Sequence, residues 1–546
     1  LQSGGIDNTV VGDEAGTAIT TGRFNTLIGK EAGDALNDAD SNVAIGKGAL
    51  SSDTQGSQST AIGTLALTAQ NFTSATDAYN VAVGAEAGKA VTTGTDNTII
   101  GGLAGDASTT GAGNTFIGKE AGTSNTTGGD NVAVGKGSLK TNTTASNNIA
   151  IGKDALELNT TGAANVAVGN FALDSNTTAN DNVAIGHDAL QANTTGALNT
   201  AVGTSALNAN TTADSNNAFG RRALYTNTTG AQNTALGYLS LYLNTTASYN
   251  TSVGVSSMQS NTTGAKNTSV GYGALTSNTT GTENVVVGEV ALDSNTTGSY
   301  NTAIGRHSLS SATTASNNTA VGRNAMGDNT TGAGNTALGK DAGAAITTGA
   351  NNICIGIDCG DTTTTGDTNI LIGNTARASA SGGANQISMG VVVTCVGDNN
   401  FTFGNQGTDS NIAFGATSIT APSDIRLKED IQDEEVGLNF INDLRPVTFL
   451  WKKEKDIPSH FDSYKEGSEE RTMNGKHNHG FIAQEVKATI DAHNLKDGFE
   501  MWQENESDGR QRVAPAALMS VMVKAVQELS TQVDELKQEL IALKGE

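Results

Sequence analysis

The chain has 546 residues, including 67 glycines and only four prolines, and 4% of its residues are aromatic. So few large apolar side chains argue against a thick globular core over most of the length and favour a thin core repeated many times. The net charge of −24 argues against a nucleic-acid partner, because phosphate contacts require lysine and arginine. No run of 18 apolar residues occurs, so we expect no membrane insertion.

The start of the chain and its cysteines add two expectations. The sequence begins at Leu1 without a signal peptide, which indicates a fragment or a processed product. Three cysteines are too few for a disulfide framework.

The first region along the chain is a repeat. A motif of the form Asn-(Thr/Val)-Ala-(Val/Ile)-Gly recurs, and from Gly84 to Gly390 its glycines keep a period of 17 without exception. Such regularity is typical of stacked units that contact only their neighbours. Prolines are absent there, as a hydrogen-bonded ladder requires, and no 3.6-residue apolar stripe favours helices. We therefore predict a long parallel β-solenoid over residues 1–400, in which 23 rungs would form a rod of roughly 110 Å.

The side chains of each unit alternate between two faces if the motif is extended. In residues 131–135, Val132 and Val134 share one face and Ala133 takes the other. The position before the glycine is almost always large and apolar, so we expect this column to form the core; it includes Val11, Ile28, Ile45, Val134, Phe219 and Leu236. A small residue, then often Leu, and then Asn-Thr-Thr follow, so each unit is predicted to hold a strand, a turn, a second short strand and a turn.

These repeats resemble the Asn-x-(Val/Ala)-Ile-Gly repeats in the head domains of trimeric bacterial adhesins. The resemblance covers most of residues 8–415 and implies a left-handed β-roll in a trimer, although the adhesin repeats are usually shorter than the unit found here, which leaves the handedness open. One thin roll would also leave an apolar side under-covered, which favours packing three chains together.

A sharp change in composition predicts a domain boundary near Pro422. All four prolines and both tryptophans lie at or beyond this position. Residues 423–546 contain 16 Lys/Arg and 25 Asp/Glu, whereas the much longer segment before them contains only 15 and 30.

Three stretches of this second region carry a further resemblance. They are Ser-Asp-Ile-Arg-Leu-Lys-Glu-Asp-Ile at 423–431, Leu-Arg-Pro-Val-Thr-Phe-Leu-Trp-Lys at 444–452 and His-Gly-Phe-Ile-Ala-Gln-Glu-Val at 479–486. With the terminal helix expected from Leu518 to Lys544, they resemble the intramolecular chaperone domain of phage endosialidases and tail fibres, a family of self-cleaving serine peptidases.

The resemblance implies a catalytic Ser–Lys dyad at Ser423 and Lys428, with scission beside Ser423. A serine hydroxyl is a weak nucleophile unless a base takes its proton. Lysine can be that base only if its pKa falls from about 10.4 towards neutrality, through desolvation or nearby positive charge. A dry trimer interface would supply the desolvation. Without the resemblance, a serine and a lysine five residues apart would indicate only a boundary serine and a solvated lysine.

The last helix has the pattern of a coiled coil. Two heptad columns run along it, formed by Met519, Val526, Val533 and Leu540 and by Met522, Leu529, Leu536 and Leu543. Val at one column and Leu at the other favours dimers in simple rules, whereas the chaperone family implies a trimer.

Other motifs are interpreted structurally. Twelve Asn-Thr-Thr triplets from Asn125 to Asn329 match the glycosylation pattern, but stacked ladders explain them. We expect Cys354 and Cys359 to be buried small residues rather than a metal pair, and His477 and His479 to lie in a surface loop rather than a zinc or catalytic site. We expect no cofactor and no metal.

These observations combine into one interpretation. Residues 1–400 form the solenoid, 401–422 a transition segment to the cleavage site, 423–517 a small α+β chaperone and autoprotease, and 518–546 a coiled-coil helix. We expect a homotrimeric tail fibre of a virion, made in the host cytoplasm, that contacts other tail or virion proteins and a host receptor or glycan. Its only enzymatic activity would be one cut in its own chain, with no turnover activity in the shaft.

Two alternatives stay open. A bacterial surface adhesin of the β-roll type would carry a membrane anchor. A structural fibre without cleavage would keep Ser423 and Lys428 as relics.

Overall fold

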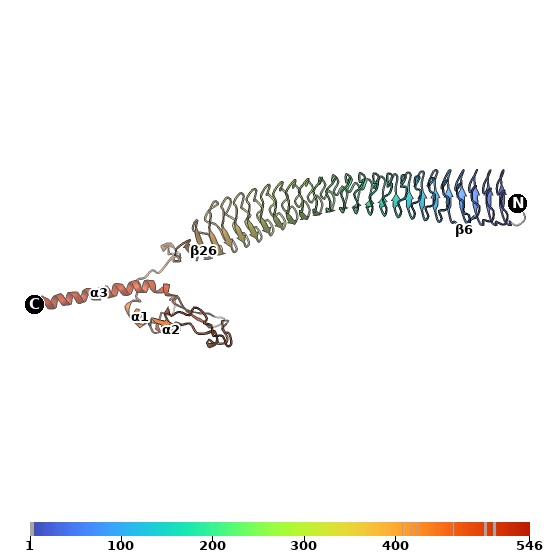
Figure 1. The fold of residues 1–546 in the computed structure, drawn as a ribbon. Helices are drawn as coiled ribbons and strands as arrows, with labels where there is room; N and C mark the ends of the chain where they lie inside the picture. Colours follow the sequence, from blue (N-terminus) through green and yellow to red (C-terminus); the bar gives the residue numbers. More distant parts are fainter. Residues whose placement is uncertain are drawn as a thin grey trace. The chain divides into compact units, whose positions relative to one another are not determined.

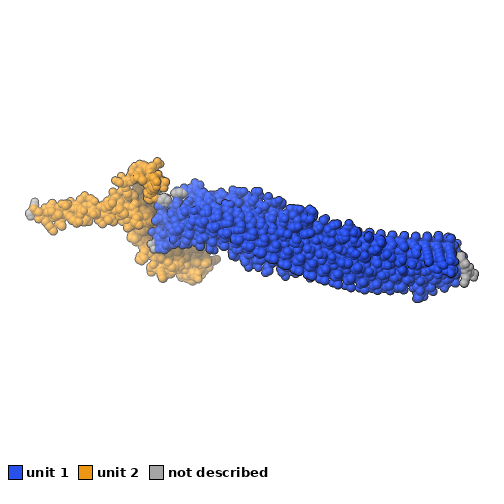
Figure 2. All heavy atoms as spheres, turned by 90° about the horizontal axis from the view of Figure 1, so that it is seen from above, with its two compact units in different colours: residues 1–422 blue, residues 423–546 orange. Residues whose placement is uncertain are grey.

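A computed structural model describes residues 5–406, 408–416, 418–421, 423–461, 463–495, 499–505 and 509–545. The chain separates into two compact units, Leu1–Pro422 and Ser423–Glu546, which are coloured separately in Figure 2. The first unit is a long parallel β-solenoid, as predicted, with one strand of mostly three residues in each rung (Figure 1).

The described strands of the solenoid form one 25-stranded sheet. They are β1 (Thr9–Val11), β2 (Thr26–Ile28), β3 (Val43–Ile45), β5 (Thr60–Ile62), β7 (Val81–Val83), β8 (Thr98–Ile100), β9 (Thr115–Ile117), β10 (Val132–Val134), β11 (Ile149–Ile151), β12 (Val166–Val168), β13 (Val183–Ile185), β14 (Thr200–Val202), β15 (Asn217–Phe219), β16 (Thr234–Leu236), β17 (Thr251–Val253), β18 (Thr268–Val270), β19 (Val285–Val287), β20 (Thr302–Ile304), β21 (Thr319–Val321), β22 (Thr336–Leu338), β23 (Ile353–Ile355), β24 (Ile370–Ile372), β25 (Ile387–Val391), β26 (Asn400–Asn405) and β27 (Ser410–Ala413). Two further short strands, β4 (Gly56–Ser57) and β6 (Thr76–Asp77), pair in parallel outside this sheet, next to the one rung that is longer than 17 residues, between Gly63 and Gly84.

The register of the ladder follows the sequence period. Val132 pairs with Ile149, and Ile149 pairs with Val166, so each partner lies one full period further along the chain. The offset shortens to 14 where Ile387 pairs with Phe401, and β27 then turns back antiparallel to β26. The parallel stacking therefore stops at the β26–β27 hairpin.

The core of each rung is smaller than expected, and the predicted core column was wrong. The middle residue of each three-residue strand from β2 to β24 is buried, as Ala133 and Ala235 show, whereas Leu236, just before the glycine, is 48% exposed. In most rungs the leucine of the segment behind the strand fills the interior and the strand contributes alanine, whereas other rungs place a larger buried residue on the strand, such as Leu27 or Phe116. The large residue before each glycine consequently lies outside, and a column of exposed or half-buried apolar side chains runs along the solenoid.

The expected second strand is missing from most of the described rungs, where a tight turn takes its place; the exceptions are the short β4–β6 pair and a single bridge between Arg377 and Thr394. After Gly220, Arg222 and Leu224 adopt left-handed backbone angles, with φ of 58° and 52°. Two left-handed residues so close together break an extended segment and turn both Ala223 and Leu224 inward. Backbone hydrogen bonds still join the rungs there, as from the Leu207 N–H to the Ala223 carbonyl at 2.9 Å.

Two columns of buried asparagines hold the rungs together. Before the strand, the Asn216 N–H donates to Asn199 Oδ1 at 2.9 Å, and the Asn216 Nδ2 donates to the Gly230 carbonyl at 2.9 Å. In the Asn-Thr-Thr triplets, the side-chain amide of Asn210 donates to Asn193 Oδ1 at 2.9 Å. The triplets are therefore internal ladders, as expected, and their amides are already used in hydrogen bonds.

The second unit is a small α+β region that ends in a helix, as predicted. Its elements are the 3-10 helices η1 (Ile425–Leu427), η2 (Glu454–Asp456) and η3 (Pro515–Ala517), the helices α1 (Leu438–Asp443), α2 (Ala483–Ala492) and α3 (Leu518–Lys544), and the strands β28 (Val447–Phe449), β29 (Asn478–Gly480), β30 (Trp502–Glu504) and β31 (Gln511–Val513). Its core gathers Phe440, Leu444, Val486, Ile490, Met501, Leu518 and Val521. Figure 1 labels the three α-helices.

Candidate functional site

The two residues of the predicted dyad lie within hydrogen-bond distance. Ser423 is followed by the single turn η1, and the side chain of Asp424 caps this turn by accepting the Arg426 N–H at 2.9 Å. Because the turn reverses the chain, Lys428 at its end returns to Ser423, and its Nζ donates to the serine Oγ at 2.8 Å. This is the pairing that a serine nucleophile and a lysine base require.

An ion pair braces the same turn. The Arg426 guanidinium donates to both carboxylate oxygens of Asp424, and this hydrogen bonding lowers the pKa of the Asp424 carboxyl. The carboxylate therefore stays charged at neutral pH and holds the short helix that positions Ser423 and Lys428.

The surroundings of the dyad are open in the single chain. Ser423 and Lys428 are both exposed, and the apolar neighbours Ile425 and Leu427 are 72% and 70% exposed. A lysine amine in this setting is surrounded by water, and general-base catalysis needs it neutral. Exposed apolar side chains on both sides of a turn are typical of a surface that another surface covers.

The other two stretches that carry the family resemblance meet elsewhere in the unit, in an apolar hollow. Residues 444–452 provide β28, residues 479–486 begin within β29, and the two strands pair antiparallel, Thr448 opposite His479. Arg445 also donates to Glu485 Oε2 at 2.9 Å, which ties the two stretches together and lowers the pKa of the Glu485 carboxyl.

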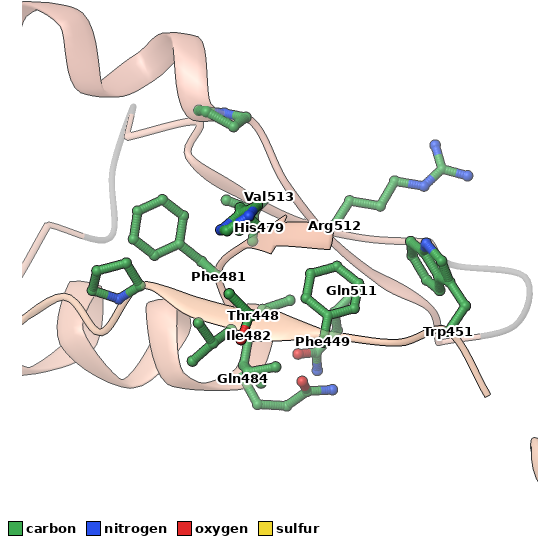
Figure 3. Close-up of a pocket in the computed structure, with 15 residues that line it drawn as sticks. Thr448, Phe449, Trp451, His479, Phe481, Ile482, Gln484, Gln511, Arg512 and Val513 are labelled. Atoms are coloured by element: carbon green, nitrogen blue, oxygen red, sulfur yellow. The ribbon is translucent and has the colours of Figure 1, made fainter. Parts of the chain in front are cut away.

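The hollow has a volume of about 1180 Å³ (Figure 3). Its lining includes Phe449, Trp451, Phe481 and Ile482, and the rings of Phe449 and Trp451 meet edge to face with centroids 5.3 Å apart. Gln511, Arg512 and Val513 of β31 complete the lining, although the sequence motifs do not include this strand. Ser423 and Lys428 are not among the lining residues, so the hollow and the dyad are separate features.

The terminal helix α3 has two different faces. Leu518 and Val521 are buried in the core of the unit, and Glu528 accepts the Leu438 N–H at 2.7 Å, which caps α1 where Gly437 offers no side chain. The residues of both predicted heptad columns are exposed instead: Met519, Val526, Val533, Leu540, Met522, Leu529, Leu536 and Leu543. The apolar seam of this helix is therefore uncovered in the single chain.

The remaining candidates take structural positions. Cys354 and Cys359 are buried, as expected, and hydrogen bonding between the two thiols together with burial raises the pKa of Cys354. His477 lies in an exposed loop, as expected, but His479 is part of β29 at the edge of the hollow. The described residues contain no group of three or more His, Cys, Asp or Glu side chains placed to hold a metal ion.

Comparison with known proteins identifies the second unit. A peptidase family model described as "Chaperone of endosialidase" matches residues 423–495, which include the dyad, α1, α2 and the β28–β29 pair. The search of curated proteins finds no match to the chain. Within the described part of the chain, every helix is too short or too polar to span a bilayer. The chain therefore carries a chaperone-of-endosialidase domain at its C-terminal end, after a long β-solenoid of 17-residue rungs.

Proposed function

We propose that this chain is the shaft of a virion tail fibre that attaches to a host cell. Residues 423–546 assemble three copies and then release themselves by scission beside Ser423, with Lys428 as the base. The observation that carries this proposal is the 2.8 Å hydrogen bond from Lys428 Nζ to Ser423 Oγ at the first residues of the chaperone domain.

Assembly of a uniform repeat needs a device that sets the register. Because one rung is nearly identical to the next, three solenoids can pair out of step by a whole rung at little cost. A terminal coiled coil removes this ambiguity, since it brings the chains together in one alignment before the shafts pack. The exposed heptad columns of α3 and the exposed column typified by Leu236 support this order of events.

The two exposed surfaces would serve different stages of assembly. The seam of α3 joins the chains first, because two heptad columns extend over more than three heptads. The outward strand residues then bury one another along the shaft, each removing apolar area from water at about 25 cal/mol per Å². The family resemblance supports three copies rather than two.

Cleavage would follow assembly because the dyad is exposed in the single chain. When partner chains cover Ile425 and Leu427, they also remove water from Lys428, and its amine loses the solvation that keeps it charged. The neutral amine takes the hydroxyl proton of Ser423, and Oγ attacks the carbonyl carbon of an adjacent peptide bond. The proton then passes to the departing amide nitrogen, and water hydrolyses the ester that remains.

Release makes the product kinetically stable. Three interlocked solenoids unfold slowly because many contacts must break together, and once the terminal domain has gone the chains cannot regain their alignment after unfolding. The shaft is then suited to a particle that meets its host outside the cell.

Mass spectrometry under denaturing conditions tests the proposal. The purified wild-type protein should yield two pieces close to residues 1–422 and 423–546. Ser423→Ala and Lys428→Arg should both remain intact, the latter because arginine keeps the charge but cannot give up its proton. Ser418→Ala, a nearby serine outside the dyad, is the matched control and should be cut like the wild type. Scission in Ser423→Ala would refute the dyad, and an intact wild-type trimer would favour a fibre without cleavage.

A further inference from the structure

One stretch of the shaft has side chains unlike the rest. Six of the eight tyrosines of the chain lie between residues 225 and 300: Tyr225, Tyr238, Tyr242, Tyr249, Tyr272 and Tyr300. Residues 215–282 contain no Asp or Glu, and no other acid-free stretch of the first unit is as long. Because successive rungs stack directly, this stretch is a continuous belt of the shaft that is free of carboxylates.

Five residues of this belt form what we call the tyrosine patch: Arg221, Arg222, Tyr225, Tyr238 and Tyr242. The rings of Tyr225 and Tyr242 occupy the same position in successive rungs and stack with centroids 5.4 Å apart and planes inclined by 17°. The guanidinium carbon of Arg221 lies 5.7 Å from the ring centroid of Tyr238, and that of Arg222 lies 5.7 Å from the ring centroid of Tyr225. The patch is thus a stacked pair of rings and a third tyrosine, with a guanidinium over Tyr225 and another over Tyr238.

The two arginines of the patch have no carboxylate partner among the described residues. Elsewhere in the described shaft, Arg306, Arg323 and Arg377 each form an ion pair with a carboxylate. Arg221 and Arg222 form no ion pair with any described residue, because the belt around them has no acid. Their donors are therefore available to an anion from outside.

The stacked tyrosines lie on the opposite side of the rung from the exposed strand column. Ser240, behind the strand, donates across the interior to Ser252 of β17 at 2.8 Å, so these two segments face each other over the core. Leu241 points into that core, and Tyr242 is the next residue and is half-buried. Packing of three shafts through the strand column would leave the stacked rings open.

We propose that the tyrosine patch binds an acidic polysaccharide, one whose sugar rings carry carboxylates. This inference rests on the proposed function, for which it names a receptor contact and the chemistry of the receptor. The tyrosine hydroxyls hydrogen-bond the sugar, and the ring surface that the stacking and the guanidiniums leave uncovered gives apolar contact to the carbon-bound hydrogens of a sugar ring. A guanidinium binds a carboxylate through two parallel hydrogen bonds.

The charge of the whole shaft explains why the belt is distinct. Elsewhere the many carboxylates would repel an acidic chain at short range, and salt screens that repulsion beyond about 8–10 Å. A polyanion can therefore settle where the carboxylates are missing and arginines remain unpaired. The rings then provide contact area that is independent of salt.

The test is a binding titration of the full protein against hyaluronan, alginate and polygalacturonate, with neutral dextran and single-stranded DNA as comparison polymers. We expect at least one of the three acidic polysaccharides to bind and dextran not to bind. The double variant Tyr225→Ala/Tyr242→Ala should weaken that binding by at least about tenfold, as should Arg221→Ala/Arg222→Ala. Tyr79→Ala, an exposed tyrosine outside the belt, is the matched control and should bind like the wild type.

Three results would overturn the proposal: no binding of any of the three polysaccharides, equal binding of dextran or DNA, or binding that the patch variants leave unchanged. Circular dichroism of each variant checks that the solenoid is intact. Scission and particle mass, measured on the same samples, separate this inference from the proposed function. Normal scission and assembly without polysaccharide binding would refute the patch alone, and binding without scission would refute the assembly mechanism alone.

Discussion

Removal of one ladder asparagine should open a single rung, and the structure sets the size of the effect. In Asn216→Ala the lost side chain leaves the buried Asn233 N–H, which donates to Asn216 Oδ1 at 3.0 Å, without its partner, whereas the Gly230 carbonyl keeps a second hydrogen bond from the Asn227 side-chain amide at 2.8 Å. A buried polar group left unpaired costs about 1–3 kcal/mol. The local free energy of opening should therefore fall by about 1–3 kcal/mol.

Hydrogen exchange followed by mass spectrometry measures this cost directly. Peptides that span Gly230 and Asn233 should exchange faster by a factor between about 5 and about 150, at about 1.4 kcal/mol per tenfold change. Asn217→Ala is the matched control, because Asn217 is the next residue and its side chain is exposed. It should change the opening energy by no more than about 0.5 kcal/mol. Equal exchange in the two variants would refute the claim that the asparagine column holds the rungs together.

Three further perturbations probe the turn, the core and the electrostatics of the shaft. Gly203→Ala should destabilise its rung by about 1–3 kcal/mol in the same exchange measurement, because a Cβ there would lie 2.7 Å from the Gly220 carbonyl and φ is 135°. Leu224→Ala should lower local stability by about 2–5 kcal/mol, whereas Leu236→Ala should leave single-chain stability nearly unchanged and weaken association, as sedimentation would show. Burial, with nearby Glu157, Asp154 and Asp188, raises the pKa of Asp174 from 3.8 to about 6. The folded state therefore binds this proton more tightly, so the rung should become more stable as pH falls from above 6 towards 4, and exchange corrected for its intrinsic pH dependence should show no such gain in Asp174→Asn.

The period and the parallel ladder could be predicted from the sequence, but the inner face of the strand could not. Alternation separates Ala133 from Val132 and Val134 without saying which side is inside. The answer depends on what the segment behind the strand contributes, and there Leu139 already fills the interior. Because valine is larger and more apolar than alanine, the prediction placed the valines in the core, which is the wrong face of the strand.

The sequence does contain a local signal that a turn, and not the predicted second strand, follows the repeat glycine. The position four residues after the repeat glycine is Leu in most rungs but Gly in others, as at Gly33 and Gly88, and both residues there have positive φ. Glycine in a column otherwise occupied by leucine indicates a left-handed turn rather than a strand. In these glycine rungs, Leu36 and Val91 stand three residues later in place of asparagine and restore the apolar volume.

The catalytic pair could be predicted only through the family resemblance, and the apolar hollow only in part. Ser423 and Lys428 came from the family resemblance, and spacing alone gave no reason to pair them. The turn that joins them depends on the Asp424 cap, a local feature that the sequence does contain. The contribution of β31 to the apolar hollow depends on tertiary packing and had no sequence signal.

Sedimentation equilibrium of the purified wild-type protein, combined with the mass of its denatured chains, tests the central claim most directly. The account predicts a particle of three shaft chains, each ending near Pro422 and freed of residues 423–546. A single, intact and stably folded chain of 546 residues would contradict it.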